Sequence, residues 1–366
     1  MDKIKLIDIC NPKQWKTIAT SQLLDDGKFP VYGANGIIGY YNEFNHEDTT
    51  VLITCRGATC GNVHISIPKS YINGNAMALD NLNEKLCLKE YLYYFLNYYD
   101  MTKIISGSAQ PQITIQGLKK IYVKVYSIEE QKNIIKILNK IKKVIDLKEK
   151  QVTNLDNIIK SQFVEMFGDP YFNEQNWKIG TISNLVADVK YGTSKPSKDG
   201  GKYKYLRMNN ITYNGKLDLT DIKYIDIPEN EIEKCSTEKG DVLFNRTNSR
   251  ELVGKTCVYD RDEKMVIAGF VIRVRVNDLA NPYFLSEYLN TKYMKKNFYN
   301  MCKNASGQSN INAKELQNIK IYIPPIELQN QFADIVKQID KQKFEIENSL
   351  KEMQKLYESL MEKYFG

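Results

Sequence analysis

Histidine is almost missing from this sequence: His46 and His64 are the two in 366 residues. Nucleophilic and zinc-dependent catalysis usually needs imidazole as a base or a ligand, and neither histidine lies beside a nucleophile-elbow motif. A Walker A motif is absent as well, which disfavours ATP hydrolysis by this chain. No catalytic residue is therefore predicted, and we interpret both histidines as ordinary surface or core residues.

Cysteine is scattered, with seven residues and no Cys-x-x-Cys spacing. Only the two histidines could complete a metal site with the closest pair, Cys55 and Cys60, so no metal site is predicted. The N-terminal residues do not resemble a secretory leader, and no apolar run approaches the length of a membrane span. We expect a cytoplasmic protein with reduced thiols and no membrane partner.

Two short segments resemble cofactor motifs without matching them. Residues 33–39 are rich in glycine but do not spell G-x-G-x-x-G, and they lie in a turn-rich β segment. Residues 281–284, Asn-Pro-Tyr-Phe, are similar to the Asn-Pro-Pro-Tyr motif of amino-methyltransferases, but the second proline and a preceding glycine-rich loop are missing. We interpret residues 281–284 as a helix start and expect no cofactor in this chain.

The bulk composition is that of an ordinary folded protein, with 42% apolar and 26% charged residues. A length of 366 residues favours two globular domains. The formal charge of +7 is a small excess for this length. It allows a polyanionic partner without requiring one.

A repeated stretch organises the chain. Residues 113–121 are followed by Ile128-Glu129-Glu130-Gln131, and residues 311–319 are followed by Ile326-Glu327-Leu328-Gln329. Each residue of the second copy lies 198 positions after its counterpart, and Phe167-Gly168 likewise precedes Phe365-Gly366 by 198. The period is too long for a solenoid unit. It indicates two copies of one module, each a globular domain followed by a long helix.

Both long helices carry an unbroken heptad pattern of apolar residues. Their steps alternate between four and three residues, and two lysines, Lys148 and Lys343, lie on the seams. Each lysine could either extend its side chain to water or fix the register of the pairing, and the sequence leaves both readings open. The seam residues are Ile134, Leu138, Ile141, Ile145, Lys148, Val152, Leu155, Ile159, Gln162 and Met166, then Phe332, Val336, Ile339, Lys343, Ile346, Leu350, Met353, Tyr357, Leu360 and Tyr364.

Helices of this composition are marginal alone, so each seam must pack on something, and the other seam is the simplest partner. If the second domain has its termini close together, the two helices run antiparallel. We therefore predict an α+β fold: two mixed α/β domains at opposite ends of a long antiparallel two-helix coiled coil, related by a pseudo-twofold axis. The predicted division is 1–127, 128–168, 169–325 and 326–366.

Within the domains, local patterns predict a few elements. Residues 31–41 indicate strands joined by tight turns, and residues 50–54 and 240–244 indicate two similar buried strands. Residues 268–276 form another expected strand, with Arg273 and Arg275 lining its face rather than touching DNA. Residues 86–99 and 282–298 are predicted helices.

Polar, basic and amide-rich loops follow the predicted strands. Arginine pairs with guanine, and asparagine or glutamine with adenine, in the major groove, while serine, threonine and lysine suit phosphates. The alternative is that these are solvated turns held by local bonds. The candidate DNA-binding residues in these loops are Arg56, Thr59, Thr193, Lys195, Arg207, Asn209, Asn210, Asn245, Arg246, Asn248, Arg250 and Lys255.

Together these features resemble the specificity subunits of type I restriction–modification systems, over almost the whole chain. The resemblance rests on residues 31–41 and 240–255, on the helix starts at 128–131 and 324–329, and on the Ser/Gly-Gln-x-Asn/Gln-Ile segments ending at Ile113 and Ile311. Two departures are mild: Ser127 stands where proline is usual, and Leu328 where glutamate is usual. The family-like segments add the DNA-binding candidates Tyr32, Asn35, Ser108, Gln110, Gln112, Gln308 and Asn310.

The resemblance implies that the globular units are target-recognition domains, each reading one half of a bipartite, asymmetric double-stranded DNA site. It implies that the helices act as a ruler for the spacer and bind two methyltransferase subunits, which methylate adenine N6 with their own S-adenosylmethionine. Two restriction subunits would supply ATP- and Mg²⁺-dependent translocation and cleavage. The alternatives are a self-contained methyltransferase or nuclease, and a coiled-coil scaffold with no nucleic-acid role.

Overall fold

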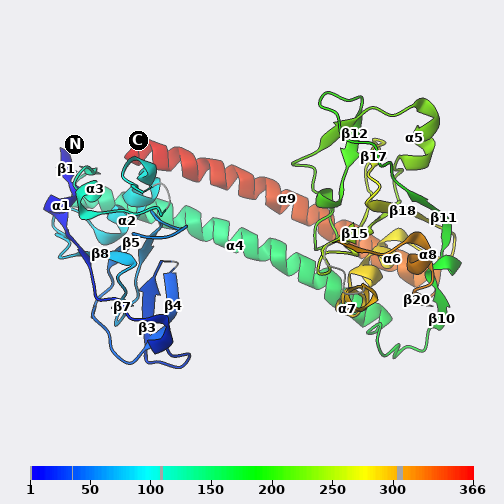
Figure 1. Cartoon of the computed structure of the whole chain (residues 1–366), viewed down its shortest axis with the longest axis horizontal. Coiled ribbons are helices and arrows are strands. Elements are labelled where there is room, and N and C mark those ends of the chain that lie inside the picture. Colours follow the sequence, from blue (N-terminus) through cyan, green and yellow to red (C-terminus); the bar gives the residue numbers. More distant parts are fainter. Residues whose placement is uncertain (1, 35, 108–109, 303–307) are drawn as a thin grey trace. The chain divides into compact units, whose positions relative to one another are not determined.

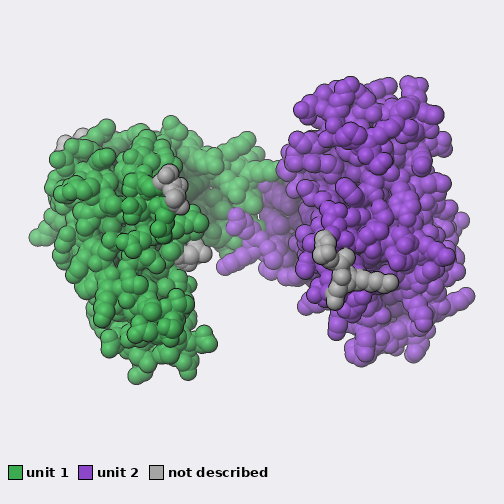
Figure 2. Space-filling view, viewed as in Figure 1, with its two compact units in different colours: residues 1–148, 348–366 green, residues 149–347 purple. Residues whose placement is uncertain are grey.

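The protein was analysed as a computed structural model that describes residues 2–34, 36–107, 110–302 and 308–366. The chain divides into two compact units (Figures 1 and 2). Unit 1 combines residues 1–148 with 348–366, and unit 2 comprises residues 149–347. Each unit thus takes in part of both long helices, and the predicted division into four segments stays a prediction.

Unit 1 is built on a four-stranded antiparallel sheet with the strand order β2-β8-β5-β6. Its strand β5 is buried along its whole length, as the apolar run at 50–54 predicts. A second sheet has the order β4-β3-β7, in which β3 and β7 are parallel. The bounds are β1 Asp2–Lys5, α1 Leu6–Ile9, β2 Asn11–Gln14, β3 Phe29–Gly33, β4 Gly36–Tyr41, β5 Val51–Thr54, β6 Val63–Ile65, β7 Tyr71–Ile72, β8 Ala76–Asp80, α2 Lys89–Tyr98, α3 Ile115–Leu118 and β9 Tyr122–Val125.

Unit 2 repeats this topology sheet by sheet. The sheet β11-β18-β14-β16 corresponds to the four-stranded sheet of unit 1, and the sheet β13-β12-β17 corresponds to its mixed sheet. The strand pair β10-β20 corresponds to the pair β1-β9. This repeated topology is the internal duplication that the 198-residue offset predicts. The bounds are β10 Lys178–Thr181, β11 Val186–Tyr191, β12 Tyr203–Leu206, β13 Lys223–Ile225, α5 Glu229–Cys235, β14 Val242–Asn245, β15 Thr247–Asn248, β16 Thr256–Val258, β17 Val266–Ile267, β18 Val271–Val276, α6 Pro282–Asn290, α7 Lys292–Met301, β19 Ser309–Asn310, α8 Ala313–Gln317 and β20 Lys320–Ile323.

One predicted helix is wrong in its extent. The expected helix 282–298 is two helices, α6 and α7, because the chain leaves helical geometry at Thr291. The Thr291 side chain accepts a hydrogen bond from the backbone N–H of Met294 and caps the second helix. The aromatic periodicity continues across both helices, and therefore it did not reveal the break.

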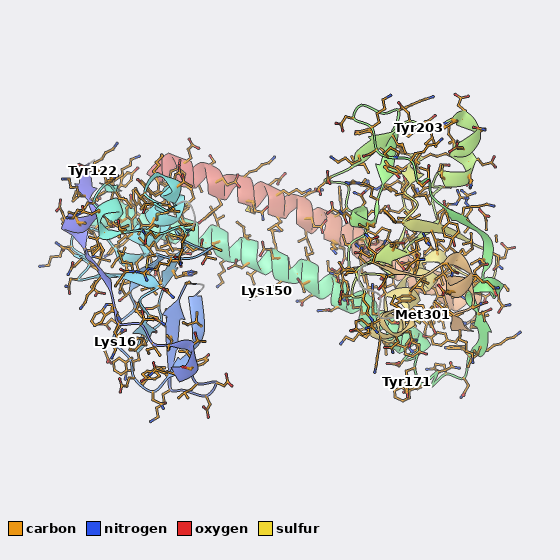
Figure 3. The ribbon with its side chains drawn as sticks, viewed as in Figure 1. Lys16, Tyr122, Lys150, Tyr171, Tyr203 and Met301 are labelled. Carbon is orange, nitrogen blue, oxygen red and sulfur yellow. The ribbon has the colours of Figure 1, made fainter. Side chains whose placement is uncertain are left out.

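The two long helices are α4, Ile128–Phe167, and α9, Ile326–Phe365. Ser127 and Glu130 exchange hydrogen bonds at the start of α4 (Ser127 N to Glu130 Oε2, 3.0 Å; Glu130 N to Ser127 Oγ, 3.3 Å). This is a capping box, so serine can replace the proline that is usual before this helix. Around Lys150, α4 exposes most of its side chains (Figure 3).

Within each unit, the helix parts pack antiparallel. In unit 2, Phe163 and Phe167 near the end of α4 contact Phe332 near the start of α9, with ring centroids 5.5 Å apart in both pairs. Farther from this end, Lys343 forms an ion pair with Asp156 (2.6 Å). In unit 1, the end of α9 packs against the domain through Phe365 and Tyr91 (5.3 Å). The predicted α+β fold with two paired long helices is confirmed.

Lys343 resolves one alternative that the sequence left open. Its side chain and that of Asp156 are 13% and 16% exposed, so this seam lysine is paired across the helices rather than extended into water. The position 198 residues earlier is Ile145, so the pair has no symmetric counterpart. A single polar pair in an apolar seam is a way to fix register.

The glutamine that recurs at the start of each long helix, Gln131 in α4 and Gln329 in α9, is buried and links the helix to its domain. We call this residue the clamp. Gln131 is fully buried; its Nε2 donates to the carbonyls of Leu86 (2.8 Å) and Tyr126 (2.9 Å), and its Oε1 accepts from Leu88 N (2.8 Å). Each bond satisfies a backbone group that would otherwise be costly to bury.

Gln329 makes the same three bonds in unit 2. Its Nε2 donates to the carbonyls of Leu279 (3.1 Å) and Pro324 (2.8 Å), and its Oε1 accepts from Asn281 N (2.9 Å). Gln329 is also fully buried. The two glutamines therefore tie the start of each long helix to the start of α2 or α6.

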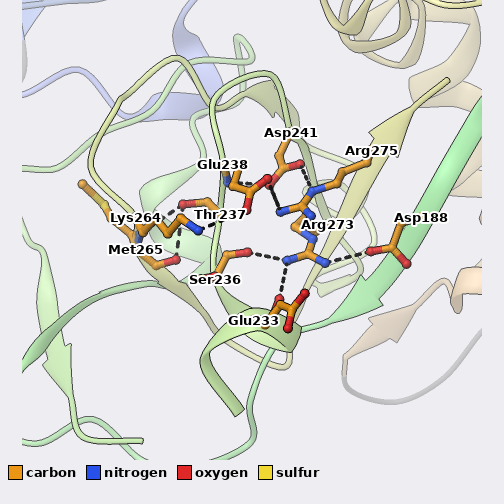
Figure 4. A network of polar contacts seen from close by, with 10 residues as sticks. All are labelled: Asp188, Glu233, Ser236, Thr237, Glu238, Asp241, Lys264, Met265, Arg273 and Arg275. Atoms are coloured by element: carbon orange, nitrogen blue, oxygen red, sulfur yellow. Dashed lines mark hydrogen bonds and ion pairs between the residues drawn. The ribbon is translucent and has the colours of Figure 1, made fainter. Parts of the chain in front are cut away.

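Arg273 and Arg275 hold β18 to its surroundings (Figure 4). Arg273 is 1% exposed and donates to Asp188 Oδ2 (2.8 Å) and to the carbonyls of Glu233 and Ser236. Burial alone would raise the pKa of Asp188, but its bonds to Arg273 and Lys190 outweigh burial and hold it below the ordinary value. The predicted role of Arg273 on a strand face is confirmed.

Arg275 forms the second part of this network. Its Nε donates to Asp241 Oδ1 (2.8 Å), and its Nη2 lies 3.1 Å from Glu238 Oε2. Together the two arginines hold α5 and the turn before β14 against the sheet. Both guanidinium groups are therefore occupied by partners within unit 2.

Candidate nucleic-acid interface

Each unit has a loop edge where two distant segments pair. In unit 1, the loop after β5 meets the segment before α3, with Ile113 N bonded to Cys55 O (3.0 Å). In unit 2, the loop after β14 meets the segment before α8, with Ile311 N bonded to Arg246 O (2.9 Å). The predicted polar loops and the predicted Gln-rich segments, far apart in sequence, therefore lie together in each unit. We call these places the unit 1 edge and the unit 2 edge.

The unit 1 edge presents exposed polar side chains. Arg56 and Gln112 form an isolated antiparallel bridge through their backbones, and both side chains are exposed. Gln110 is exposed nearby in sequence. Thr59 is half-buried and donates to Ala34 O. Arginine and glutamine on an exposed edge can reach base edges or phosphates.

Three other candidates of unit 1 do not present a described, accessible side chain. Tyr32 is 7% exposed, and its hydroxyl accepts a hydrogen bond from Ile67 N (3.2 Å). Asn35 and Ser108 lie outside the described residues.

The unit 2 edge carries two arginines held against tyrosine rings. The Arg246 guanidinium lies 5.0 Å from the Tyr191 ring centroid, and its Nη1 donates to Gly269 O (3.3 Å). The Arg250 guanidinium lies 3.9 Å from the Tyr299 ring centroid, and its Nε donates to Tyr299 O (2.9 Å). Stacking on an aromatic face limits the motion of a guanidinium before it meets a ligand.

Several predicted DNA-binding residues of unit 2 are instead buried in its framework. Asn245 is fully buried and donates to the carbonyls of Thr247 (3.0 Å) and Phe270 (3.2 Å), and Asn248 donates to Asn245 Oδ1 (2.9 Å). Asn210, 2% exposed, donates to Asp218 O (2.8 Å). These amides fix the shape of the loops, because each bond ties a side chain to a backbone group or to another side chain of a neighbouring segment.

Lys255 and Thr193 are also enclosed. Lys255 is 7% exposed and donates to Met208 O (2.9 Å), and burial lowers its pKa. The Thr193 hydroxyl accepts from Lys195 N (3.2 Å). Both side chains are therefore buried within unit 2.

The remaining candidates are accessible to different degrees. Arg207 and Lys195 pair with Asp221 (2.7 Å) and Glu231 (2.8 Å), respectively. Asn209, Gln308 and Asn310 are exposed. The Asn310 Oδ1 accepts from the Thr247 hydroxyl (3.1 Å), which places this amide on the unit 2 edge.

Sequence reasoning missed Tyr191 and Tyr299, the rings beneath the two arginines. Tyr191 also accepts a hydrogen bond from Ala313 N through its hydroxyl (2.8 Å), which ties β11 to the start of α8. Nothing in the spacing of a tyrosine 55 or 49 residues away from its arginine could have indicated the stacking. A chain of 25 tyrosines offers too many partners.

The described residues include the histidines, the cysteines and other possible metal ligands that the sequence predictions concern. No group of three or more His, Cys, Asp or Glu among them could hold a metal ion. His46 lies between Asn45 Oδ1 (2.7 Å) and Asp80 Oδ1 (2.8 Å), which is a structural network. The seven cysteines are free, and six of them are buried. Among the described helices, none is long and apolar enough to cross a bilayer.

The duplicated fold and its two loop edges define a two-module α+β protein whose modules present different polar surfaces. A family model described as the type I restriction modification DNA specificity domain matches residues 1–157 and 174–354. The match covers more than half of the sequence, and the chain belongs to this family.

Similar proteins carry consistent names. The chain is 30% identical over 196 residues to the putative type I restriction enzyme MjaX specificity subunit of Methanocaldococcus jannaschii, covering 52% of this chain and 46% of that protein. It is 24% identical over 192 residues to the EcoKI specificity subunit of Escherichia coli, covering 50% and 41%. The chain thus spans less than half the length of these two relatives. A third, the MjaVIII specificity subunit of M. jannaschii, is 24% identical over 340 residues, covering 85% and 78%.

Two solved structures share the fold. The S subunit of a type I restriction–modification system from M. genitalium superposes with a TM-score of 0.64 at 17% identity, covering 100% of this chain and 96% of that one. A chain from a study of complex assembly and conformational transition of the type I R-M system gives 0.56 at 16% identity, covering 100% and 97%. At these identities, the likeness concerns the fold.

Proposed function

We propose that this chain is the DNA-specificity subunit of a type I restriction–modification complex and that it is not itself catalytic. Each unit would read one half of a bipartite, asymmetric double-stranded DNA site through its loop edge. The observation that carries the proposal is the repeated edge: the same backbone pairing, Cys55 with Ile113 and Arg246 with Ile311, presents different side chains in the two units. Different side chains meet different base edges, so the two half-sites should differ.

The residues proposed to contact DNA are the accessible members of the two edges. Five of them are exposed: Arg56, Gln110 and Gln112 in unit 1, and Gln308 and Asn310 in unit 2. Arg246 and Arg250 of unit 2 are partly exposed. The buried amides would act indirectly by holding the unit 2 edge in shape. No observation places the other described candidates among the accessible residues of the two edges, and their role in DNA binding stays a prediction. These candidates are Tyr32, Thr59, Thr193, Lys195, Arg207, Asn209 and Lys255.

The partners follow from the family and from the names of the relatives. The chain would bind two methyltransferase subunits that hold S-adenosylmethionine and methylate adenine N6, and two restriction subunits that use ATP and Mg²⁺. This chain would hold no cofactor of its own, and it would work in the cytoplasm, where the host DNA lies.

The test uses the chain assembled with its methyltransferase subunit and a library of methylatable DNA sites. Arg246→Ala should weaken or relax recognition at one half-site only, by about 1–3 kcal/mol if the contact is to a base. Arg56→Ala should do the same at the other half-site. Arg261→Ala, at an exposed arginine of unit 2 whose side chain is 55% accessible, is the matched control and should change neither.

Two outcomes would count against the proposal. Equal losses at both half-sites from Arg246→Ala would indicate a general phosphate contact or misfolding. Methylation by the chain without its partner, or cleavage of DNA by the chain with Mg²⁺ alone, would show an enzyme rather than a specificity subunit.

A further inference from the structure

Unit 1 contains an open groove of about 500 Å³ beside the first half of α4. Strand β6, helix α2 and helix α4 form its walls, and the β3–β4 hairpin contributes Tyr32 and Ile37. The other lining residues are His64, Ile65, Glu90, Tyr93, Tyr94, Asn139 and Lys142. All of these residues belong to unit 1.

The internal repeat identifies the same place in unit 2. His64 pairs with Leu52 of the central strand, and Cys257 pairs with Leu243 in the same register, so β16 corresponds to β6. Because the clamps Gln131 and Gln329 bind Leu88 N and Asn281 N alike, α6 corresponds to α2. The offset of 198 places Asp340 of α9 where α4 has Lys142.

In unit 2, a segment of the chain itself occupies this place. Strands β12 and β13 are joined by residues 207–222, whereas β3 and β4 are joined by residues 34 and 35 alone. This longer connection reaches all three walls. Leu217 packs in the cluster that contains Cys257 of β16, a Cβ at Gly215 would lie 2.5 Å from Asn290 Nδ2 of α6, and Lys216 binds Asp340 of α9 (2.5 Å).

The walls that are open in the groove of unit 1 are therefore covered in unit 2 by residues 207–222. The charge on the long helix is opposite in the two units, because unit 1 has Lys142 where unit 2 has Asp340, the residue that pairs with Lys216. Lys142 donates to the Tyr93 hydroxyl (3.2 Å), and among the described residues no carboxylate lies within 4 Å of its Nζ. His64 Nε2 is buried and has no hydrogen-bond partner among the described residues.

We propose that the groove of unit 1 receives a projecting turn of the methyltransferase subunit, which places a carboxylate on Lys142 and an apolar residue against Tyr93 and Ile37. The turn would cover the walls of the groove in unit 1, as residues 211–217 cover the corresponding walls in unit 2. The partner's identity rests on the proposed function, whereas the shape and charge of the turn rest on the comparison between the two units.

A protein turn fits the groove better than a DNA phosphate does. Glu90 also lies in the lining, where its Oε2 accepts from Asn139 Nδ2 (2.8 Å). Its negative charge disfavours the successive phosphates of a DNA strand more than a single carboxylate that pairs with Lys142. Tyrosine and isoleucine walls offer apolar area, which a turn with an apolar side chain can bury and a phosphate cannot.

The experiment places a photoreactive benzophenone amino acid at Ile37, which is 47% exposed and lines the groove, in the full chain assembled with purified methyltransferase subunit and target DNA. The same probe at Ile67, 51% exposed and outside the lining, is the control. A cross-link from position 37, and not from 67, to an acidic turn of the methyltransferase subunit is the expected result. A cross-link to DNA or to a second copy of this chain would overturn the proposal.

Charge reversal gives an independent readout. Lys142→Glu should weaken binding of the methyltransferase subunit about ten-fold, and changing the cross-linked acidic residue to lysine should restore it. Lys143→Glu, at the exposed neighbouring lysine of α4, should have little effect. Equal effects of the two variants would overturn the proposal. If the wild-type complex methylates adenine but shows no cross-link at 37, the groove proposal fails alone; if no complex forms, both proposals fail.

Discussion

Replacing the Gln329 clamp should destabilise unit 2 far more than a typical surface change would. Gln329→Met keeps the length and flexibility of the side chain but removes all three of its hydrogen bonds. Each neutral bond contributes about 0.5–1.5 kcal/mol, and stranding buried N–H and C=O groups adds to the loss. We expect the free energy of unfolding of unit 2 to fall by about 2–5 kcal/mol.

Tryptophan fluorescence in urea can measure this loss one unit at a time. The chain has two tryptophans, Trp15 in unit 1 and Trp177 in unit 2. Trp177 donates to Phe167 O (3.0 Å) and packs against the unit 2 core, so it reports on unfolding there once Trp15 is replaced by phenylalanine. Gln338→Met, at an exposed glutamine of the same helix, is the control.

The repeat supplies a second check of the clamp. Gln131→Met should destabilise unit 1 by a similar amount, because Gln131 makes the same three bonds there. A loss below about 0.5 kcal/mol, the range of ordinary surface substitutions, would refute the argument that these bonds support the joint between domain and helix.

Three further predictions test the helices and the buried charges. Burial lowers the pKa of Lys295 from 10.5 to about 8. Between pH 8 and pH 10.5 the unfolded chain therefore holds this proton while the folded chain has lost it. As the pH rises through this range, the free energy of unfolding of unit 2 should increase by up to about 1.4 kcal/mol per pH unit. Lys295→Met should raise stability at pH 7 and abolish that gain in urea titrations at several pH values; an unchanged slope would contradict the assignment. Lys343→Met should leave the part-buried Asp156 carboxylate without its partner and cost about 1–3 kcal/mol, and Lys343→Met with Asp156→Leu should recover most of the loss. Removing one heptad from each of α4 and α9 shortens each helix by about 10 Å, and the ruler hypothesis then predicts a methylated spacer about three base pairs shorter; an unchanged spacer, read by sequencing methylated adenines, would reject it.

The accessible part of the candidate site was smaller than the sequence suggested. Asn245, Asn248 and Asn210 have the side chains that read adenine, yet their amides bind the backbone and each other. A residue type states which hydrogen bonds a side chain can make, but not which partner lies nearest. Conversely, Tyr191 and Tyr299 had no motif to mark them, and only folding brought them beneath Arg246 and Arg250.

The sequence by itself determined the repeat, the two long helices and the fold class. An offset of 198 and a heptad seam are properties of the chain order, and local periodicity suffices to specify which face of a helix is apolar. The bounds of α4 and α9 follow the pattern closely, because capping residues and glycines mark their ends in the sequence.

Only the tertiary structure decided what the repeated glutamine does, which polar residues remain accessible, and why one unit has an open groove. Each depends on contacts between segments that lie tens of residues apart, such as Gln329 with Leu279 and Lys216 with Asp340. The burial and pairing that set the energy of a polar side chain arise only when those segments meet. The duplicated helix start thus predicted two modules of the same fold. Only the tertiary structure showed that residues 207–222 cover in unit 2 the walls that form an open groove in unit 1.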